Sequence, residues 1–209
     1  MTKRDLILIG AGGHSRSCID VIELEGKYRI AGLVGVQDEV GSRIFGYEVL
    51  TTDEGLDVLA KQVPYALVST GQIHSAELRI RLYDRALEAG FSFPAIISPT
   101  SYISPRATIG AGTILMHGSV INSGVAIGEN CIINSRALIE HGSKVADHCH
   151  ISTGAILNGG TSIGLGSFIG SGSIVKEGIE IGTGSLVGMG LTVRHNLITN
   201  SKYFGEIKS

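Results

Sequence analysis

A short stretch in the second half of the chain holds side chains whose types and spacing could do chemistry. Glu140 and His141 are adjacent. Asn134 lies seven residues before His141, and His150 lies nine residues after it. A neutral imidazole can accept a proton near neutral pH, and a positioned base of this kind accelerates a reaction by about 10²–10⁴-fold. We therefore predict that His141 is a general base, oriented by the carboxylate of Glu140 or, alternatively, of Asp147.

A second candidate site is the glycine-rich loop GAGGHS at residues 10–15, which follows a short apolar run at residues 5–9. Loops of this form between a strand and a helix are typical of nucleotide-binding domains. A dinucleotide site would also need an acidic residue at the end of the second strand, where Gly-Val-Gln stands at residues 35–37. The loop is therefore in the context of a nucleotide-binding turn, but these residues argue against NAD as its ligand.

The elements that carry this loop alternate between strand and helix. Apolar runs predict strands, and amphipathic patterns predict helices, with Thr52 as a candidate N-cap. The expected strands span residues 5–9, 29–36 and 65–70, and the expected helices span residues 15–24, 52–62 and 74–90. This order predicts a small parallel sheet, and we assign residues 1–98 to a Rossmann-like βαβ domain.

The elements that carry His141 form a repeat of six residues. Sixteen positions at this spacing hold Ile, Leu or Val without a slip of register: Ile103, Ile109, Leu115, Ile121, Ile127, Ile133, Ile139, Val145, Ile151, Leu157, Ile163, Ile169, Val175, Ile181, Val187 and Val193. Hexapeptide periodicity is the signature of a β-helix, in which three hexads close one triangular coil. We assign residues 99–195 to this β-helix, and residues 196–209, which leave the pattern, to a tail that caps the last coil.

The composition excludes several classes of protein. Hydrophobic residues make up 43% of the chain, charged residues 17%, and the net charge is −2, so no basic excess favours nucleic acid or an anionic membrane. No apolar stretch approaches the ~20 residues that span a bilayer. The three cysteines form no CxxC pair, which suits a reducing compartment. We expect a cytoplasmic protein without membrane insertion.

Together these segments resemble the NeuD/PglD-type sugar O- or N-acetyltransferases, which are left-handed β-helix acyltransferases with an N-terminal βαβ domain. Four segments carry the resemblance: LILIGAGGHS (6–15), FPAIISPTSYIS (93–104), CIINSRALIEHG (131–142) and HCHISTGAILNGG (148–160). It covers nearly the whole chain. Family members often carry an acidic residue directly after the histidine of the EH motif, where Gly142 stands here.

The resemblance implies a function and roles for individual residues. Family members form trimers and bind acetyl-CoA between neighbouring β-helices, and the N-terminal domain helps to hold a sugar or nucleotide-sugar acceptor. His141 would be the base. Residues expected to contact the acceptor are Gly12, Gly13, His14 and Asn134. Residues expected along acetyl-CoA are His150, Gly170, Gly172 and Gly188, with Lys176, Arg194 and Lys202 as candidates for its phosphates.

Several alternatives remain open at the level of sequence. The acetylated group is either the amine of a UDP-amino-sugar or a hydroxyl of a sialic acid-like sugar. A chain with this fold could also bind a nucleotide sugar without catalysis. A third alternative is a trimeric zinc enzyme of the carbonic anhydrase type, with His141, His148 and His150 as ligands. Acetyl transfer needs no metal, and none is expected.

Overall fold

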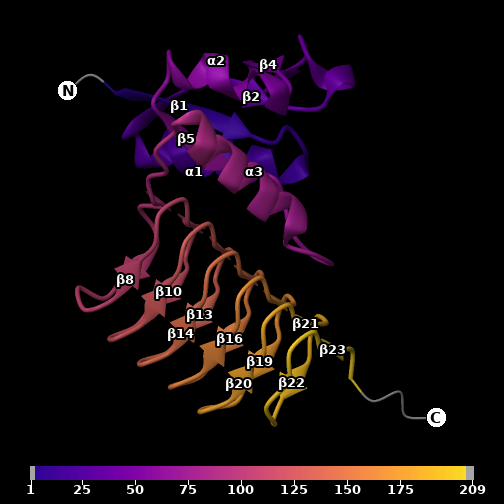
Figure 1. Cartoon of the computed structure of the whole chain (residues 1–209). Coiled ribbons are helices and arrows are strands. Elements are labelled where there is room, and N and C mark those ends of the chain that lie inside the picture. Colours follow the sequence, from indigo (N-terminus) through magenta and orange to yellow (C-terminus); the bar gives the residue numbers. More distant parts are fainter. Residues whose placement is uncertain (1–2, 206–209) are drawn as a thin grey trace. The chain divides into compact units, whose positions relative to one another are not determined.

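The computed structural model describes residues 3–205 and divides into two compact units (Figure 1). The N-terminal unit comprises the chain up to Gly71 together with Glu77–Pro99. The β-helix unit comprises the chain from Thr100 onward together with the short segment Gln72–Ala76. This segment therefore packs with coils that are distant from it in the sequence.

The N-terminal unit is built on a sheet with the strand order β3-β4-β2-β1-β5. Strand β1 pairs in parallel with β2 and β5, β4 pairs in parallel with β2, and β3 closes an antiparallel edge hairpin with β4. The interior strand β1 is an apolar run buried along residues 6–9, as expected for a parallel strand covered on both faces. The bounds are β1 (Arg4–Ile9), α1 (Gly13–Glu25), β2 (Tyr28–Val34), η1 (Gln37–Glu39), β3 (Arg43–Ile44), β4 (Tyr47–Thr51), η2 (Asp53–Gly55), α2 (Leu56–Ala60), β5 (Tyr65–Val68), α3 (Glu77–Ala89) and β6 (Ile96–Ile97).

The predicted βαβ order is confirmed, but three details of it are wrong. The hairpin of β3 and β4 was not expected, because each of its strands is short and lacks a long apolar run. The helix expected over 52–62 begins only at Leu56, after a 3-10 turn, and Thr52 makes no side-chain capping hydrogen bond. The helix expected from residue 74 begins at Glu77, because Gln72–Ala76 packs with the β-helix instead.

The loop after β1 depends on one glycine. Gly10 has a φ of +120°, and a Cβ at this position would lie 2.8 Å from the backbone nitrogen of Thr70. Only glycine fits both the dihedral angle and the close approach. The ends of β1 and β5 can therefore meet, and α1 begins at Gly13 with Gly12 as its N-cap.

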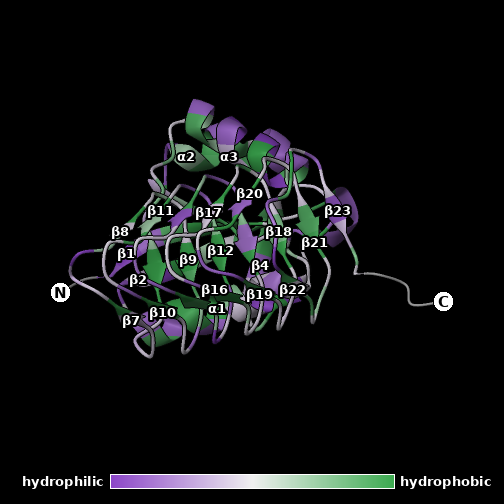
Figure 2. Ribbon diagram, turned by 90° about the horizontal axis from the view of Figure 1, so that it is seen from below, coloured by the Kyte–Doolittle hydropathy of each residue, from purple (hydrophilic) through white to green (hydrophobic). Residues whose placement is uncertain are grey.

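The β-helix unit consists of two-residue strands that stack on strands eighteen residues away (Figures 1 and 2). Each of the sixteen predicted aliphatic positions is the second residue of one of the strands β7–β22, and from Leu115 onward all are buried. The predicted left-handed β-helix is confirmed. One side holds β7 (Tyr102–Ile103), β10 (Val120–Ile121), β13 (Leu138–Ile139), β16 (Ile156–Leu157), β19 (Ile174–Val175) and β22 (Thr192–Val193).

The other two sides follow the same rule. The second side holds β8 (Thr108–Ile109), β11 (Ala126–Ile127), β14 (Lys144–Val145), β17 (Ser162–Ile163) and β20 (Glu180–Ile181). The third side holds β9 (Ile114–Leu115), β12 (Ile132–Ile133), β15 (His150–Ile151), β18 (Phe168–Ile169), β21 (Leu186–Val187) and β23 (Lys202–Tyr203).

Each corner of the β-helix places one residue in the left-handed region. From residue 112 to residue 190, every sixth residue has a φ between +50° and +73°. Glycine fills most of these corners, but Asn130, Arg136 and His148 fill three of them. A left-handed conformation costs a side-chain-bearing residue roughly 1–2 kcal/mol. The three strained corners lie in the coils around His141.

The residues after Val193 continue the β-helix in a shorter register. Leu197 bridges to Ile181, and β23 pairs with β21, so the offset is sixteen residues instead of eighteen. The loss of two residues explains why this stretch leaves the hexad pattern. The last four residues of the tail that we expected to act as a cap, 206–209, lie outside the described residues.

The structure of residues 3–205 bears on membrane insertion and on the role of the cysteines. None of the helices there is long and apolar enough to span a bilayer. Cys18, Cys131 and Cys149 are buried free thiols, and burial raises the pKa of Cys18 to about 12 despite the opposing effect of Arg79. The cysteines therefore serve as small core residues.

We predict that the inward stack carries the stability of the β-helix. Ile139→Ala should lower the free energy of unfolding by about 2–5 kcal/mol, because Ile139 is fully buried and the change leaves a cavity. Ile198→Ala should change it by less than about 0.5 kcal/mol, because Ile198 is 82% exposed. Denaturation in guanidinium measures both, and equal effects would contradict the assignment.

Candidate active site

His141 stands at a corner of the β-helix, directly after strand β13 and Glu140. The residue is exposed, and its ring leans over Gly159 in the next coil. A Cβ built on Gly159 would lie 2.7 Å from Cε1 and 2.8 Å from Nε2 of His141. The imidazole is thus accessible from outside the coil and occupies space that a neighbouring side chain would otherwise fill.

The two carboxylates predicted to orient His141 are engaged elsewhere. Glu140 accepts hydrogen bonds through Oε2 from Nδ2 of Asn122, at 3.0 Å, and from the backbone N–H of His141, at 3.4 Å. Asp147 accepts from the backbone N–H of Glu129 at 2.7 Å. Within residues 3–205 neither carboxylate bonds to the His141 ring. Glu140 instead holds the backbone of the corner that carries the ring.

Asn134 and His150 meet at a different corner, where they form a chain of hydrogen bonds. Nδ1 of His150 lies 2.6 Å from the carbonyl oxygen of Gln72, and Nε2 lies 3.2 Å from Nδ2 of Asn134. A carbonyl can only accept, so Nδ1 carries the proton of the neutral ring and Nε2 accepts from the Asn134 amide. The amide oxygen of Asn134 in turn accepts from the N–H of Ser135 at 2.8 Å. Every donor in this series of hydrogen bonds therefore faces an acceptor.

His150 is held as a buried residue. It is 7% exposed, and its ring packs edge-on against Phe168 with centroids 5.1 Å apart. Gln72, itself 3% exposed, also donates from Nε2 to the carbonyl of Gly166 at 3.2 Å. The segment from Gln72 to Ala76 thus fixes the orientation of His150, and through it that of the Asn134 side chain.

The predicted residues are therefore brought together in two groups. Asn134 precedes β13, whereas Glu140 and His141 follow it, so the two groups occupy opposite ends of one strand of a coil. Asn134 and His150 are hydrogen-bonded to each other, whereas the His141 ring lies over Gly159.

The three glycines predicted along acetyl-CoA also shape the coils of the β-helix. A Cβ on Gly170 would lie 2.6 Å from the backbone nitrogen of Met189, so close stacking of coils already requires glycine there. Gly172 sits at a left-handed corner, and Gly188 faces Leu191 and Phe204. These glycines have structural reasons of their own.

Two of the predicted cations line a cavity on the β-helix. Lys176 and Arg194 lie on its wall with Asn158 and His195, and the cavity measures about 470 Å³. Asn158, Lys176 and Arg194 are spaced by eighteen residues, in the same column of corners as Glu140. The third predicted cation, Lys202, lies on β23, on another side of the coil.

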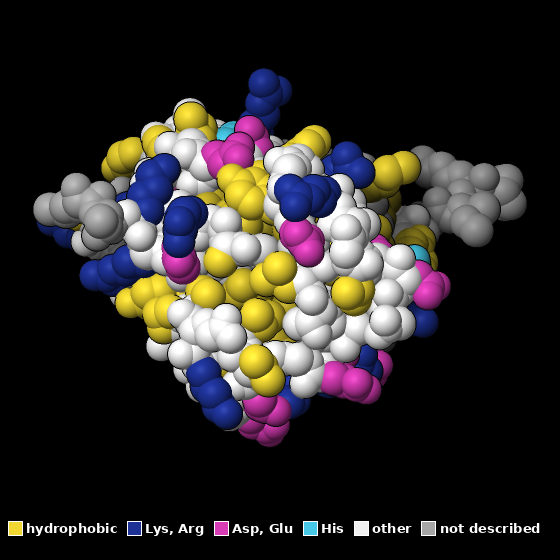
Figure 3. Space-filling model, turned by 90° about the horizontal axis from the view of Figure 1, so that it is seen from above, with side chains coloured by type: hydrophobic (Ala, Val, Ile, Leu, Met, Phe, Trp, Pro, Cys, Tyr) yellow, Lys and Arg dark blue, Asp and Glu magenta, His cyan; other side chains and the backbone are white. Residues whose placement is uncertain are grey.

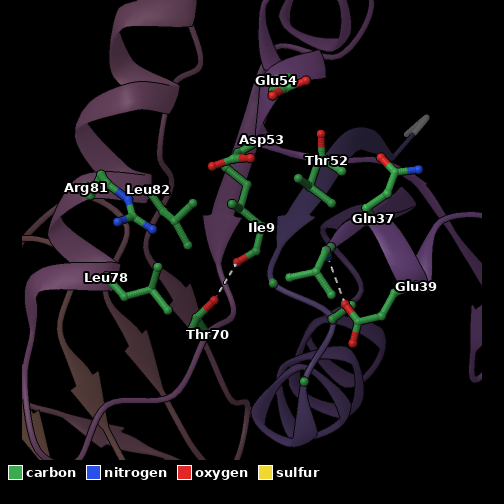
Figure 4. A pocket seen from close by; sticks show the side chains of 16 residues that line it. Ile9, Gln37, Glu39, Thr52, Asp53, Glu54, Thr70, Leu78, Arg81 and Leu82 are labelled. Atoms are coloured by element: carbon green, nitrogen blue, oxygen red, sulfur yellow. Dashed lines mark hydrogen bonds between the residues drawn. The ribbon is translucent and has the colours of Figure 1, made fainter.

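The N-terminal unit contains a larger cavity of about 510 Å³ at the glycine-rich loop (Figure 4). Gly12 and the carboxyl ends of β1 and β2 form one part of the wall, and Thr52 and Leu82 form another. Asp53 and Arg81 place opposite charges on it. Cavities of this size at the carboxyl ends of parallel strands are typical ligand sites.

The structure differs from the sequence in whether a carboxylate lies near the end of β2. No acidic residue ends β2 in the sequence, but Glu39 folds back from η1 and accepts the N–H of Val36 at 3.0 Å. A carboxylate therefore does reach the end of β2. Of the predicted acceptor residues, Gly12 lines the cavity, while Gly13 opens α1 and His14, half-buried, lies beside Gly71.

The histidines considered as zinc ligands take separate partners. Nδ1 of His148 lies 3.0 Å from Nδ2 of Asn130, His150 bonds to Gln72 and Asn134, and His141 lies over Gly159. Among residues 3–205 no three His, Cys, Asp or Glu side chains gather in a way that could hold a metal ion.

The surface charge carries no sign of a single polyanionic partner on the face shown in Figure 3. Lys and Arg side chains lie interspersed with Asp and Glu side chains around a central apolar area. Mixed signs of this kind do not produce the one-signed field that steers nucleic acid to a protein.

Three family models match the chain. The PglD N-terminal domain matches residues 5–86, the bacterial transferase hexapeptide (six repeats) matches residues 106–141, and the hexapeptide repeat of succinyl-transferase matches residues 160–194. No curated protein sequence matches the chain.

Solved structures cover both units. PerB from Caulobacter crescentus, in complex with CoA and GDP-perosamine, is 31% identical, with a TM-score of 0.87 over 93% of this chain and 91% of PerB. The chain belongs to the NeuD/PglD-type sugar acetyltransferases. This acetyltransferase is also similar to the acetyltransferase domain of PglB from Neisseria gonorrhoeae in complex with acetyl coenzyme A, at 28% identity and a TM-score of 0.85 over 94% of each chain. WeeI from Acinetobacter baumannii shares the fold at 22% identity, with a TM-score of 0.81 over 93% of this chain and 94% of WeeI.

The predicted family, the β-helix fold and the acetyl-CoA-dependent sugar acetyltransferase activity are confirmed by these matches. The sequence prediction missed Asn122, Gln72 and Gly159. One signal was available for Gly159, because Gly160 alone satisfies the left-handed corner and leaves its neighbour unexplained. Gln72 gave no such signal, since its contacts lie 78 and 94 residues further along the chain.

We predict that His150 of this acetyltransferase is a neutral ring protonated on Nδ1. Long-range ¹H–¹⁵N spectra at pH 7.5 should show Nε2 as the unprotonated nitrogen, because the Gln72 carbonyl can only accept a proton. Signals of a ring protonated on Nε2 would contradict the hydrogen-bond chain. His150→Phe provides the assignment, since only the signals of this residue disappear.

Proposed function

We propose that this acetyltransferase moves the acetyl group of acetyl-CoA to an amine or hydroxyl of a nucleotide-linked sugar, with His141 as the general base. The observation that carries the proposal is the exposed His141 ring, at a corner whose column of residues leads to the cavity of Lys176 and Arg194. The cavity is lined by Lys176 and Arg194, with Glu177 4.0 Å from the Lys176 ammonium, so an exposed imidazole and cations for an anionic donor lie in one region.

The chemistry assigned to His141 is proton transfer. Its neutral ring accepts a proton from the attacking amine or hydroxyl as that atom bonds to the thioester carbonyl carbon. The imidazolium then returns the proton to the departing sulfur as the carbon–sulfur bond breaks, so the ring ends as it began. Glu140 supports this role indirectly, because it holds the backbone N–H of His141.

The β-helix surface fits acetyl-CoA in charge. Successive coils lie about 4.8 Å apart, so Lys176 and Arg194 follow the Glu140–His141 corner at two and three coil spacings. Guanidinium and ammonium groups suit the phosphates of CoA, and the neighbouring Ile174 offers apolar surface to the rest of its arm. His150, Gly170, Gly172 and Gly188 remain the predicted contacts on the other corner.

The cavity of the N-terminal unit is the proposed acceptor site. The start of α1 at Gly13 presents backbone N–H groups that favour a diphosphate, and the cavity volume suits a nucleotide. The structure related at 31% identity, a perosamine N-acetyltransferase with GDP-perosamine, favours the amine of an amino sugar over a sialic acid hydroxyl. Gly12, Gly13, His14 and Asn134 are the acceptor contacts in this proposal.

A homotrimer with sites between protomers would complete the site. His141 and Asn134 stand at opposite ends of β13 in one chain, and in this proposal His141 of one copy and Asn134 of a second copy meet at one acceptor. Val120, Leu138, Ile156 and Ile174 form an apolar column on the same side of the coil. The next side presents Lys144, Ser162 and Glu180 instead. Cyclic association through the apolar side would bury this column.

The buried free cysteines are compatible with a cytoplasmic enzyme.

We predict that His141→Ala lowers turnover by about 10²-fold or more without unfolding the protein. The assay follows free CoA released from acetyl-CoA with GDP- and UDP-linked amino sugars, sialic acid and CMP-sialic acid as acceptors. Unchanged turnover would refute His141 as the base. No release with any acceptor would instead favour a protein that binds nucleotide sugars without catalysis.

We predict that Ile156→Lys, on the apolar side of the coil, converts trimers to monomers and abolishes turnover. A charge buried at the centre of an interface would lack a partner. Ser162→Lys, on the polar side, is the matched control and should leave trimers intact. Light scattering coupled to gel filtration measures the mass, and circular dichroism confirms the fold. A wild-type protein that runs as a monomer would contradict the trimer.

A further inference from the structure

The corner position that carries His141 bears a side chain in every hexad from residue 111 to residue 189 except one. Stepping by six from residue 111 to residue 189, this position holds Ala, His, Ser, Glu, Asp, Thr, Leu or Met, and it holds glycine only at Gly159. Gly159 lies eighteen residues after His141, so it is the next residue in the same column. The one bare position therefore adjoins the proposed base.

The backbone does not explain this glycine. The left-handed corner of its coil is Gly160, with a φ of +69°, whereas Gly159 has no left-handed φ. An alanine could adopt the conformation of Gly159. The glycines Gly164, Gly170 and Gly182, in contrast, would bring a Cβ against the backbone of the next coil.

What fills the space at Gly159 is the imidazole of His141. The three atoms nearest to a Cβ at Gly159 are Cε1, Nε2 and Nδ1 of His141, at 2.7, 2.8 and 3.4 Å. Real Cβ atoms essentially never come within 3.0 Å of another heavy atom, so even one methyl group would displace the ring. No other side chain comes as near to this position.

The displacement would affect the edge of the ring that the chemistry uses. Nε2 and Cε1 face Gly159, and the preceding residue, Asn158, lines the cavity with Lys176 and Arg194. A ring seated over Gly159 thus lies against the coil whose residue Asn158 lines that cavity. A side chain at position 159 would push Nε2 and Cε1 out of this place.

We infer that Gly159 is a positioning residue: the absence of a side chain there forms the seat that holds the His141 ring in its working orientation. The inference rests on the proposed role of His141 as the base. It adds a residue that need not touch either substrate and acts through the place it leaves for the imidazole.

The test is Gly159→Ala in the full-length protein, compared with His141→Ala and with the double variant. Misplacing a catalytic group by about 1 Å can cost about 10²-fold in rate, so kcat of Gly159→Ala should fall by a factor of that order. Its midpoint of unfolding should stay unchanged or rise slightly, because alanine fits the backbone and restricts the unfolded chain. In the His141→Ala background, the same substitution should have no further effect on kcat.

A spectroscopic readout keeps the inference testable if the double variant is too slow to assay. The Cε1–H signal of His141, assigned by its loss in His141→Ala, should move in Gly159→Ala. Gly154→Ala is the control, because Gly154 is left-handed, with a φ of +65°, and has no atom within 4 Å of a Cβ. This variant should lower the midpoint of unfolding but leave the His141 signal in place.

The outcomes separate the inference from the proposed function. Full activity in His141→Ala would refute the base itself. Loss of activity in His141→Ala with wild-type kcat and an unmoved ring signal in Gly159→Ala would refute the seat alone. A loss of kcat in Gly159→Ala that persists in the double variant would also refute it, because the glycine would then act independently of His141.

Discussion

The structure depends on the stacking of inward aliphatic side chains eighteen residues apart. Each coil of the β-helix presents three such side chains, and each packs on the equivalent residue of the coils before and after it. Because strands of two residues form few hydrogen bonds of their own, this stack and the parallel backbone pairing stabilise each other through nearest neighbours. The stack therefore fixes the position of every outward side chain, which makes the β-helix a rigid support for a site.

The site uses the positions that the stack leaves free. His141 and Glu140 lie at corners, and His150 and the apolar column lie on outward strand positions. The stack also tolerates strain close to them. Asn130, Arg136 and His148 adopt left-handed conformations that glycine adopts at the other corners, and the pairing on both sides over-determines their backbone. A solenoid tolerates local strain of this kind, because neighbouring coils hold each corner in place.

The segment from Gln72 to Ala76 shows how the N-terminal half of the chain contributes to the β-helix. It contributes a carbonyl that sets the tautomer of His150, and an amide that bonds to Gly166. His150 then determines which atoms of the Asn134 amide face outward. The family shares a fold and acetyl-CoA chemistry, whereas in the proposed function the acceptor is selected by side chains at such outward positions and by the cavity of the N-terminal unit.

The sequence alone determined the β-helix and its register, because one local rule repeats sixteen times and each repetition confirms the last. It indicated the family through the glycine-rich loop and the segments around His141 and His150. It also singled out His141, Asn134 and His150 through their spacing. It did not reveal the β3–β4 hairpin, the late start of α3, or the contacts of Gln72, because short elements carry little periodic signal and these partners are distant in the chain. The partner of each site residue was decided only by the tertiary structure. Glu140 bonds to Asn122, His150 to Gln72, and His141 rests on Gly159, since such contacts depend on how far each side chain reaches across stacked coils.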